Sequence, residues 1–114
     1  MAFVLSKAKS YSWPVSFDLP VDGGQHEEQT FDVQFKRMPQ SWIADISQKM
    51  DADEVKSWDV AREIVIGWSG ITGDDGKDIP FSQKAFDQLL DVPTVAVAIV
   101  TAFFRSITGV KEKN

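Results

Sequence analysis

The stretch "SWPVSFDL", Ser12 to Leu19, alternates between apolar and polar side chains. A period of two is typical of a β-strand that turns one face to a core and the other to solvent. The stretch "TFDVQFK", Thr30 to Lys36, alternates in the same way. The two runs predict two strands whose apolar side chains face the helices: Trp13, Val15, Phe17, Phe31, Val33 and Phe35.

The polar segment "PVDGGQHEEQ", Pro20 to Gln29, is expected to connect these strands. Its Asp-Gly-Gly sequence favours a turn. The simplest arrangement is an antiparallel β-hairpin over about residues 12–36 with a long polar tip. Because Pro14 has no N–H to donate, its strand is expected at a sheet edge or paired on its other side there. A lone hairpin is unstable in water, so its aromatic face must pack on other elements.

From Ser41 onward the apolar spacing changes to that of helices. Ser41 is the expected N-cap of a first helix, which carries Trp42, Ile43 and Ile46 on one side. A second, longer helix is expected over about Glu54–Trp68, and its expected cap is one of two aspartates, Asp51 or Asp53.

Two further helices are expected towards the C-terminus. Ser82 starts the third, and Phe81 and Phe86 have the spacing of a hydrophobic staple around its cap. This helix should end near Asp91, because Pro93 disfavours a helical conformation in the residue before it. The fourth helix is expected to begin after a cap at Thr94 and to run to Thr108, with Gly109 at C′.

These elements predict one domain over residues 1–114. Its expected fold class is α+β and mainly helical, with an N-terminal antiparallel β-hairpin packed on about four C-terminal helices. The helical part is expected over about residues 41–108, followed by a frayed tail over 110–114.

The composition indicates a globular chain with protein partners. Apolar residues make up 43% of the chain, enough for a core, and the formal net charge is −5. An acidic chain without a strong basic patch is not expected to bind nucleic acid. The chain has no cysteine, which excludes disulfides and thiolate chemistry. Its longest apolar run, Val95–Phe104, is about half of a membrane span, so we expect a soluble intracellular protein.

The loop "GWSGITGDDGKDIPFS", Gly67 to Ser82, invites a metal or phosphate interpretation. A calcium loop that starts at Asp74 would have Gly76 third and Ala85 twelfth, where a glycine at the sixth position and a glutamate at the twelfth are needed. A phosphate loop requires Ser or Thr after Gly-Lys, and Asp78 stands there. We therefore expect a structural joint that holds no metal.

Nothing in the sequence favours catalysis. The only histidine, His26, lies beside Glu27 and Glu28 in the polar segment between the strands, where a solvated side chain is expected. The serines show no nucleophile-elbow pattern. We expect no catalytic residue, cofactor, metal or small-molecule substrate.

The fourth expected helix is apolar over about twice the width that an ordinary surface helix buries. One interpretation is a central helix surrounded by its own domain. The other is that a second face contacts another subunit or partner. Under the second interpretation, at least one of Phe103 and Phe104 should lie near an intersubunit surface, because they point about 100° apart. The candidate interface residues are Val97, Val100, Phe103, Phe104 and Ile107.

The segment Arg62–Gly109 resembles the tail assembly chaperones of long-tailed phages. The resemblance is carried by Gly67-Trp68, the Asp75-Gly76 joint, Ile79-Pro80-Phe81-Ser82, the Leu89-Leu90 helix with Pro93, and the apolar last helix. The strand pair "SWPVSFDLPVDG" and "FDVQFKR" is also similar to that family.

The resemblance implies a protein that self-associates in the host cytoplasm and acts through the tape-measure protein and the tail-tube protein. It implies absence from the mature virion and, in many such phages, a longer product made by programmed frameshift. Two alternatives stay open: a structural subunit of a phage head–tail connector or tail-terminator ring, and a small cellular protein-binding module.

Overall fold

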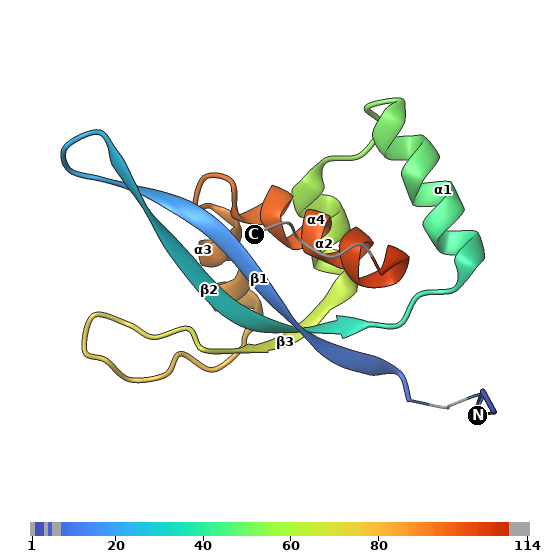
Figure 1. Cartoon of the computed structure of the whole chain (residues 1–114), viewed down its shortest axis with the longest axis horizontal. Coiled ribbons are helices and arrows are strands. Elements are labelled where there is room, and N and C mark those ends of the chain that lie inside the picture. The colour runs from blue at the N-terminus through green and yellow to red at the C-terminus, as the bar shows by residue number, and fades with distance from the viewer. Residues whose placement is uncertain (1, 4, 6–7, 110–114) are drawn as a thin grey trace.

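A computed structural model describes residues 2–3, 5 and 8–109. The chain forms an α+β fold with one three-stranded antiparallel sheet and four helices (Figure 1). The α+β class is confirmed. The expectation of a mainly helical chain with about four helices holds only roughly, because a third strand was not expected and part of one expected helix is strand. In chain order the elements are β1 (Ser10–Val21), β2 (Gln25–Lys36), α1 (Gln40–Asp51), α2 (Ser57–Ile64), β3 (Val65–Ser69), α3 (Gln83–Leu90) and α4 (Val95–Thr108).

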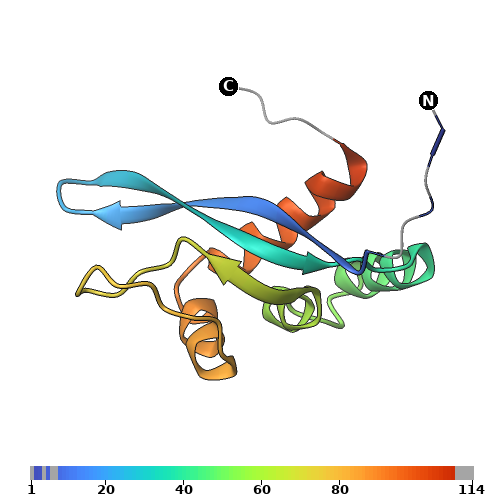
Figure 2. The same cartoon turned by 90° about the horizontal axis from the view of Figure 1, so that it is seen from below.

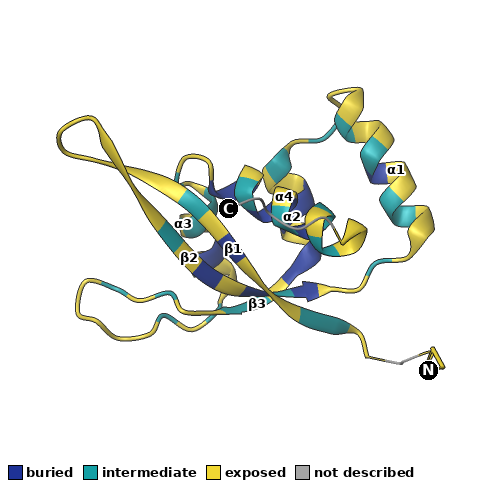
Figure 3. Ribbon diagram, in the orientation of Figure 1, coloured by how far each residue is buried: buried dark blue, intermediate teal, exposed yellow. Residues whose placement is uncertain are grey.

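The hairpin of β1 and β2 is longer than the sequence suggested. The two strands pair without interruption from Ser10 opposite Lys36 to Val21 opposite Gln25. The expected long polar tip is therefore wrong, since only three residues form the turn. Gly23 and Gly24 close it with φ of +86° and +73°, a conformation that glycine adopts without steric cost. The turn end projects beyond the helices and is exposed on both faces (Figures 1 and 3). Its β2 residues, 25–29, are all polar, so no apolar alternation marked them as strand.

The expected helix over Glu54–Trp68 is wrong in its second half. α2 ends at Ile64, and the chain continues as β3, in which Val65 lies opposite Phe35 and Trp68 opposite Val33. β-Branched residues from Ile64 onward favour an extended chain, and Gly67 is a poor helix former. The edge of β2 that faces away from β1 supplies the backbone partners.

Two expected helix caps are also wrong. α1 begins one residue before Ser41, directly after Pro39. α2 begins after Lys56, neither Asp51 nor Asp53, and the Lys56 backbone N–H donates to the Asp59 carboxylate at 3.2 Å. The Pro39 carbonyl accepts from the N–H groups of Trp42 and Ile43, and the Lys56 carbonyl accepts from those of Asp59 and Val60.

The boundaries of the last two helices are confirmed. The hydroxyl of Ser82 accepts a hydrogen bond from the Ala85 N–H at 3.1 Å, and the Phe81 and Phe86 rings lie 5.5 Å apart. α3 ends at Leu90, as expected from Pro93. α4 follows Thr94, whose side chain makes no cap hydrogen bond, and ends at Thr108 before Gly109 in the left-handed conformation.

The core lies between one face of the sheet and helices α2 and α4. Val15, Phe31, Val33 and Phe35 are buried there, as the alternation predicted (Figure 3). The Phe35 ring meets the Phe103 ring of α4 edge-to-face, with centroids 5.3 Å apart. Two residues predicted to face the helices are less enclosed than these four: Phe17 is half-buried, and Trp13 remains 37% exposed.

The opposite face of the hairpin is polar. Ser16 and Thr30 form a cross-strand hydrogen bond at 3.0 Å, and the Gln34 amide donates to the Ser10 hydroxyl at 2.8 Å. β1 is an edge strand, as Pro14 predicted. The sheet therefore has one face for the core and one for solvent, which is the ordinary arrangement of a small antiparallel sheet.

Replacing Phe35 by Ala should lower the free energy of unfolding by about 3–5 kcal/mol, because a fully buried ring is lost and a cavity remains. Urea denaturation followed by circular dichroism measures this. The matched control is Leu19→Ala on the exposed end of β1, which should change stability by less than about 1 kcal/mol. Equal losses in the two variants would contradict the described core.

Candidate protein-interaction surface

The five candidate interface residues on α4 separate into interior and surface. Val100 and Phe103 are 4% and 1% exposed, so the chain's own core occupies them and a partner cannot reach them in this conformation. Val97 and Ile107 are 57% and 40% exposed, and Phe104 is half-buried. The interpretation of α4 as a central helix therefore holds for one side of the helix and fails for the other.

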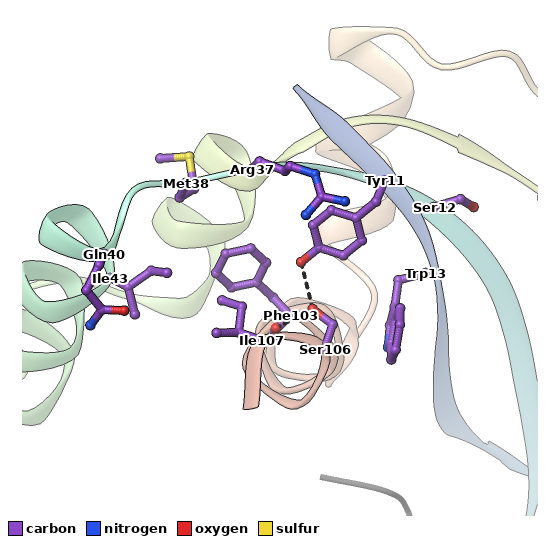
Figure 4. Close-up of a pocket in the computed structure, with 10 residues that line it drawn as sticks. All are labelled: Tyr11, Ser12, Trp13, Arg37, Met38, Gln40, Ile43, Phe103, Ser106 and Ile107. Carbon is purple, nitrogen blue, oxygen red and sulfur yellow. Dashed lines mark hydrogen bonds between the residues drawn. The ribbon is translucent and has the colours of Figure 1, made fainter. Parts of the chain in front are cut away.

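A hollow of about 590 Å³ lies at the C-terminal end of α4, between that helix, β1 and the start of α1 (Figure 4). We call it the tyrosine groove. Its lining residues are Tyr11, Ser12, Trp13, Arg37, Met38, Gln40, Ile43, Phe103, Ser106 and Ile107.

Tyr11 is held in place at the tyrosine groove from two sides (Figure 4). The Arg37 guanidinium lies 4.8 Å from the centre of its ring, within cation–π range. The Tyr11 hydroxyl lies 2.7 Å from the Ser106 hydroxyl, and the Ser106 hydroxyl donates a hydrogen bond to the Phe103 carbonyl at 2.6 Å. Because the serine proton is used in that bond, Tyr11 donates to Ser106. The phenol hydroxyl and the ring are therefore both held by contacts within the chain.

A second hollow, of about 420 Å³, lies at the N-terminal end of α4 beside the projecting hairpin. We call it the hairpin groove. Its lining residues are Phe17, Asp18, Pro20, His26, Pro93, Thr94, Val97 and Ala98. Its only titratable side chains are Asp18 and His26, and the remaining lining is largely apolar.

A smaller hollow of about 200 Å³ joins the two along the α4–β1 contact, where Trp13 lies across from Ala98 and Ala102. Small side chains on α4 leave this space open. The three hollows follow one another along α4 and β1, and with the exposed residues Val97 and Ile107 they make up what we call the α4–β1 seam. Sequence reasoning missed its β1 side, although Tyr11 continues the alternation of Trp13 and Val15 by one more step.

The chemistry available along the seam is that of binding. Among the described residues, no group of three His, Asp or Glu side chains could hold a metal ion, and no buried side-chain polar atom lacks a hydrogen-bond partner. His26 is exposed on β2, where it lies opposite Pro20. The absence of catalysis and of cofactors stays a prediction. The seam presents apolar side chains together with polar ones such as Ser12, Arg37 and Gln40, a mixed lining that suits contact with a protein segment.

The loop after β3 is closed by its own bonds. Thr72 and Asp78 form an isolated β-bridge, and the Ile79 N–H donates to the Ile71 carbonyl at 2.8 Å. The Asp75 carboxylate accepts from the Lys77 N–H, and the Trp68 indole N–H donates to the Ile79 carbonyl at 2.7 Å. The loop thus returns upon itself and is fastened to β3, as a joint would be.

Within residues 8–109, no single helix has the length and apolar character needed to cross a bilayer. Only α3 and α4 taken together reach that length, and they are bent by 100° at Pro93.

Comparison of the chain with protein-family models, with curated proteins and with solved structures gives no match.

Titration with calcium or magnesium should leave the thermal stability unchanged to within about 0.5 kcal/mol. The Asp75 carboxylate is already engaged with its own loop. A tight site at 100-fold ligand excess would instead add about 2.7 kcal/mol. A gain that rises with metal concentration and disappears in Asp74→Asn would contradict the structural role of this loop.

Replacing Trp68 by Phe should cost about 1 kcal/mol or more beyond its packing effect, because the Ile79 carbonyl loses its indole donor. The loop should then open more readily. Limited proteolysis at Lys77 measures this opening, and the control is Trp58→Phe, whose indole has no such bond and is 49% exposed. Unchanged cleavage in Trp68→Phe would mean that the indole does not fasten the loop.

Proposed function

We propose that the protein is a non-enzymatic phage tail assembly chaperone that self-associates and binds the tape-measure and tail-tube proteins during tail morphogenesis. It acts in the host cytoplasm and is left out of the mature virion. The proposal combines the resemblance of Arg62–Gly109 and of the strand pair with the character of the α4–β1 seam. The resembling segment comprises the last three residues of α2, β3, the fastened loop, α3 and α4, all of which contribute residues to the one core or pack against it.

The observation that carries the proposal is the exposure of large apolar side chains along the seam. Val97 and Ile107 stand in solvent at opposite ends of α4, about 15 Å apart along the helix axis, and each adjoins a groove. A few apolar anchors beside grooves are typical of binding hot spots, where a partner's side chain is desolvated. An assembly factor needs such sites to hold its partners before they join the tail.

The size of the seam also favours transient binding. Its grooves are separate hollows of a few hundred Å³ beside scattered exposed residues, whereas a permanent subunit interface is broad and continuously apolar. The acidic balance of 17 acids against 12 bases adds like-charge repulsion that keeps unbound copies soluble. Both features suit a protein that must release what it binds.

The test is binding of the purified chain to the tape-measure and tail-tube proteins encoded beside it. Ile107→Asp should weaken binding to at least one of them by about tenfold or more, since an unpaired charge would be placed in an apolar contact. The matched control is Trp58→Ser, which removes an equally exposed apolar residue away from the seam and should leave affinity unchanged.

Two results would overturn the proposal. One is the absence of binding to either tail protein by the wild-type chain. The other is recovery of the chain from purified phage particles in amounts comparable to a structural subunit, measured by mass spectrometry. That second result would establish the alternative of a connector or terminator subunit.

A further inference from the structure

The described residues that precede β1 present large apolar side chains to water. Phe3 and Leu5 are each 86% exposed, more than any other large apolar residue in the described chain. This segment, which we call the arm, consists of Ala2, Phe3, Leu5, Ala8 and Lys9. It is tied to the fold where the Arg37 N–H donates to the Lys9 carbonyl at 2.8 Å. Exposed side chains of this kind mark a contact surface.

The hairpin groove has the complementary character. Phe17, Pro20, Pro93 and Val97 give it an apolar lining, and its volume of about 420 Å³ lies in the range that receives a ligand of several large groups. The projecting part of the hairpin next to it carries Asp18, Asp22, Glu27 and Glu28 and no Lys or Arg. By contrast, the sequence before β1 carries Lys7 and Lys9 and no acidic residue. An apolar segment of positive charge thus matches an apolar groove beside negative charge.

The arm cannot reach the hairpin groove of its own chain. The start of β1 and the hairpin turn lie towards opposite ends of the long axis (Figures 1 and 2). From Ser10 to Phe3 there are seven residues, which span at most about 24 Å when extended. The nearest lining residue on β1, Phe17, lies about 23 Å from Ser10 along the strand. Reversing the chain would use about four of the seven arm residues in a turn, which leaves a reach of about 10 Å. The partner for the arm must therefore come from another copy.

We propose that the arm of one copy docks in the hairpin groove of a second copy, with Phe3 and Leu5 packing beside Val97 and Phe17. The contact joins two different surfaces, so every copy offers both an arm and a groove. Association is head-to-tail and continues until a ring closes or an open chain forms. This inference specifies the self-association in the proposed function and rests on it, but it is tested separately from partner binding.

The first test uses two variants that should each abolish self-association. The arm variant combines Phe3→Ser and Leu5→Ser, and the groove variant is Val97→Asp. An aspartate in the first turn of α4 complements the helix dipole, so the groove variant should stay folded by circular dichroism. Analytical ultracentrifugation over a concentration series should show wild-type oligomers and a dissociation constant raised about tenfold or more in both variants. The control Trp58→Ser should assemble as wild type.

Mixing the two variants gives the decisive result. The arm variant keeps an intact groove and the groove variant keeps an intact arm, so an equimolar mixture should form a one-to-one dimer that grows no further. A symmetric contact between two α4 helices would give no such rescue. Failure of the mixture to dimerise, or wild-type assembly by the arm variant, would overturn the proposal.

The absence of native cysteine allows a second test. A chain carrying both Phe3→Cys and Val97→Cys should, under mild oxidation, give a ladder of covalent oligomers on a non-reducing gel. A monomer with both thiols consumed would mean that the arm binds its own chain, and free thiols would mean that the two sites never meet. Either outcome would overturn the proposal. If the arm variant is monomeric and still binds the tape-measure protein, self-association through the arm and binding of tail proteins are independent properties, and both proposals are supported.

Discussion

The edge-to-face contact of Phe35 with Phe103 joins the two halves of the molecule. Phe35 lies on the central strand β2, and β1 and β3 depend on that strand for their backbone partners. Phe103 lies on α4 and also meets the Trp42 ring of α1 at 6.2 Å. Since α2 packs between α4 and β2, the same contact closes the core around Ile64. Without it, the hairpin would be an isolated element that is only marginally stable in water.

The position of Phe103 also decides which side of α4 remains outside. Once its ring is fixed against β2, the helix turns Val100 inward, and Val97 and Ile107 are left towards solvent on either side of the β1 contact. The surface proposed to bind partners is thus a by-product of how the core is closed. A small domain of this size has too few elements to cover the whole circumference of an apolar helix. What remains uncovered is available for other chains.

Much of the architecture could be predicted because the local sequence patterns and the tertiary packing favour the same secondary structure. The alternation around Val15 and Val33 and the cap at Ser82 are local patterns, and the structure keeps both. β3 was missed because Val65 and Trp68 are three residues apart, which is a helical spacing. They lie opposite Phe35 and Val33 in the sheet only because the register shifts between Gln34 and Phe35. Sequence reasoning could not tell which residues of α4 are buried and which are exposed, since Val97 and Val100 have the same side chain. The packing of α4 against distant elements, mainly β1 and α2, distinguishes them.

The two prolines of β1 limit how such molecules can stick together. Pro14 and Pro20 fall at even positions of the strand and pair with Asp32 and His26 without an N–H of their own. Alternate residues of a strand direct their amides to the same side, so both missing donors belong to the outer edge. A second strand could not form a complete ladder there. Crowded copies of the chain are in this way steered away from fibrous aggregation and towards contacts that side chains can specify and reverse.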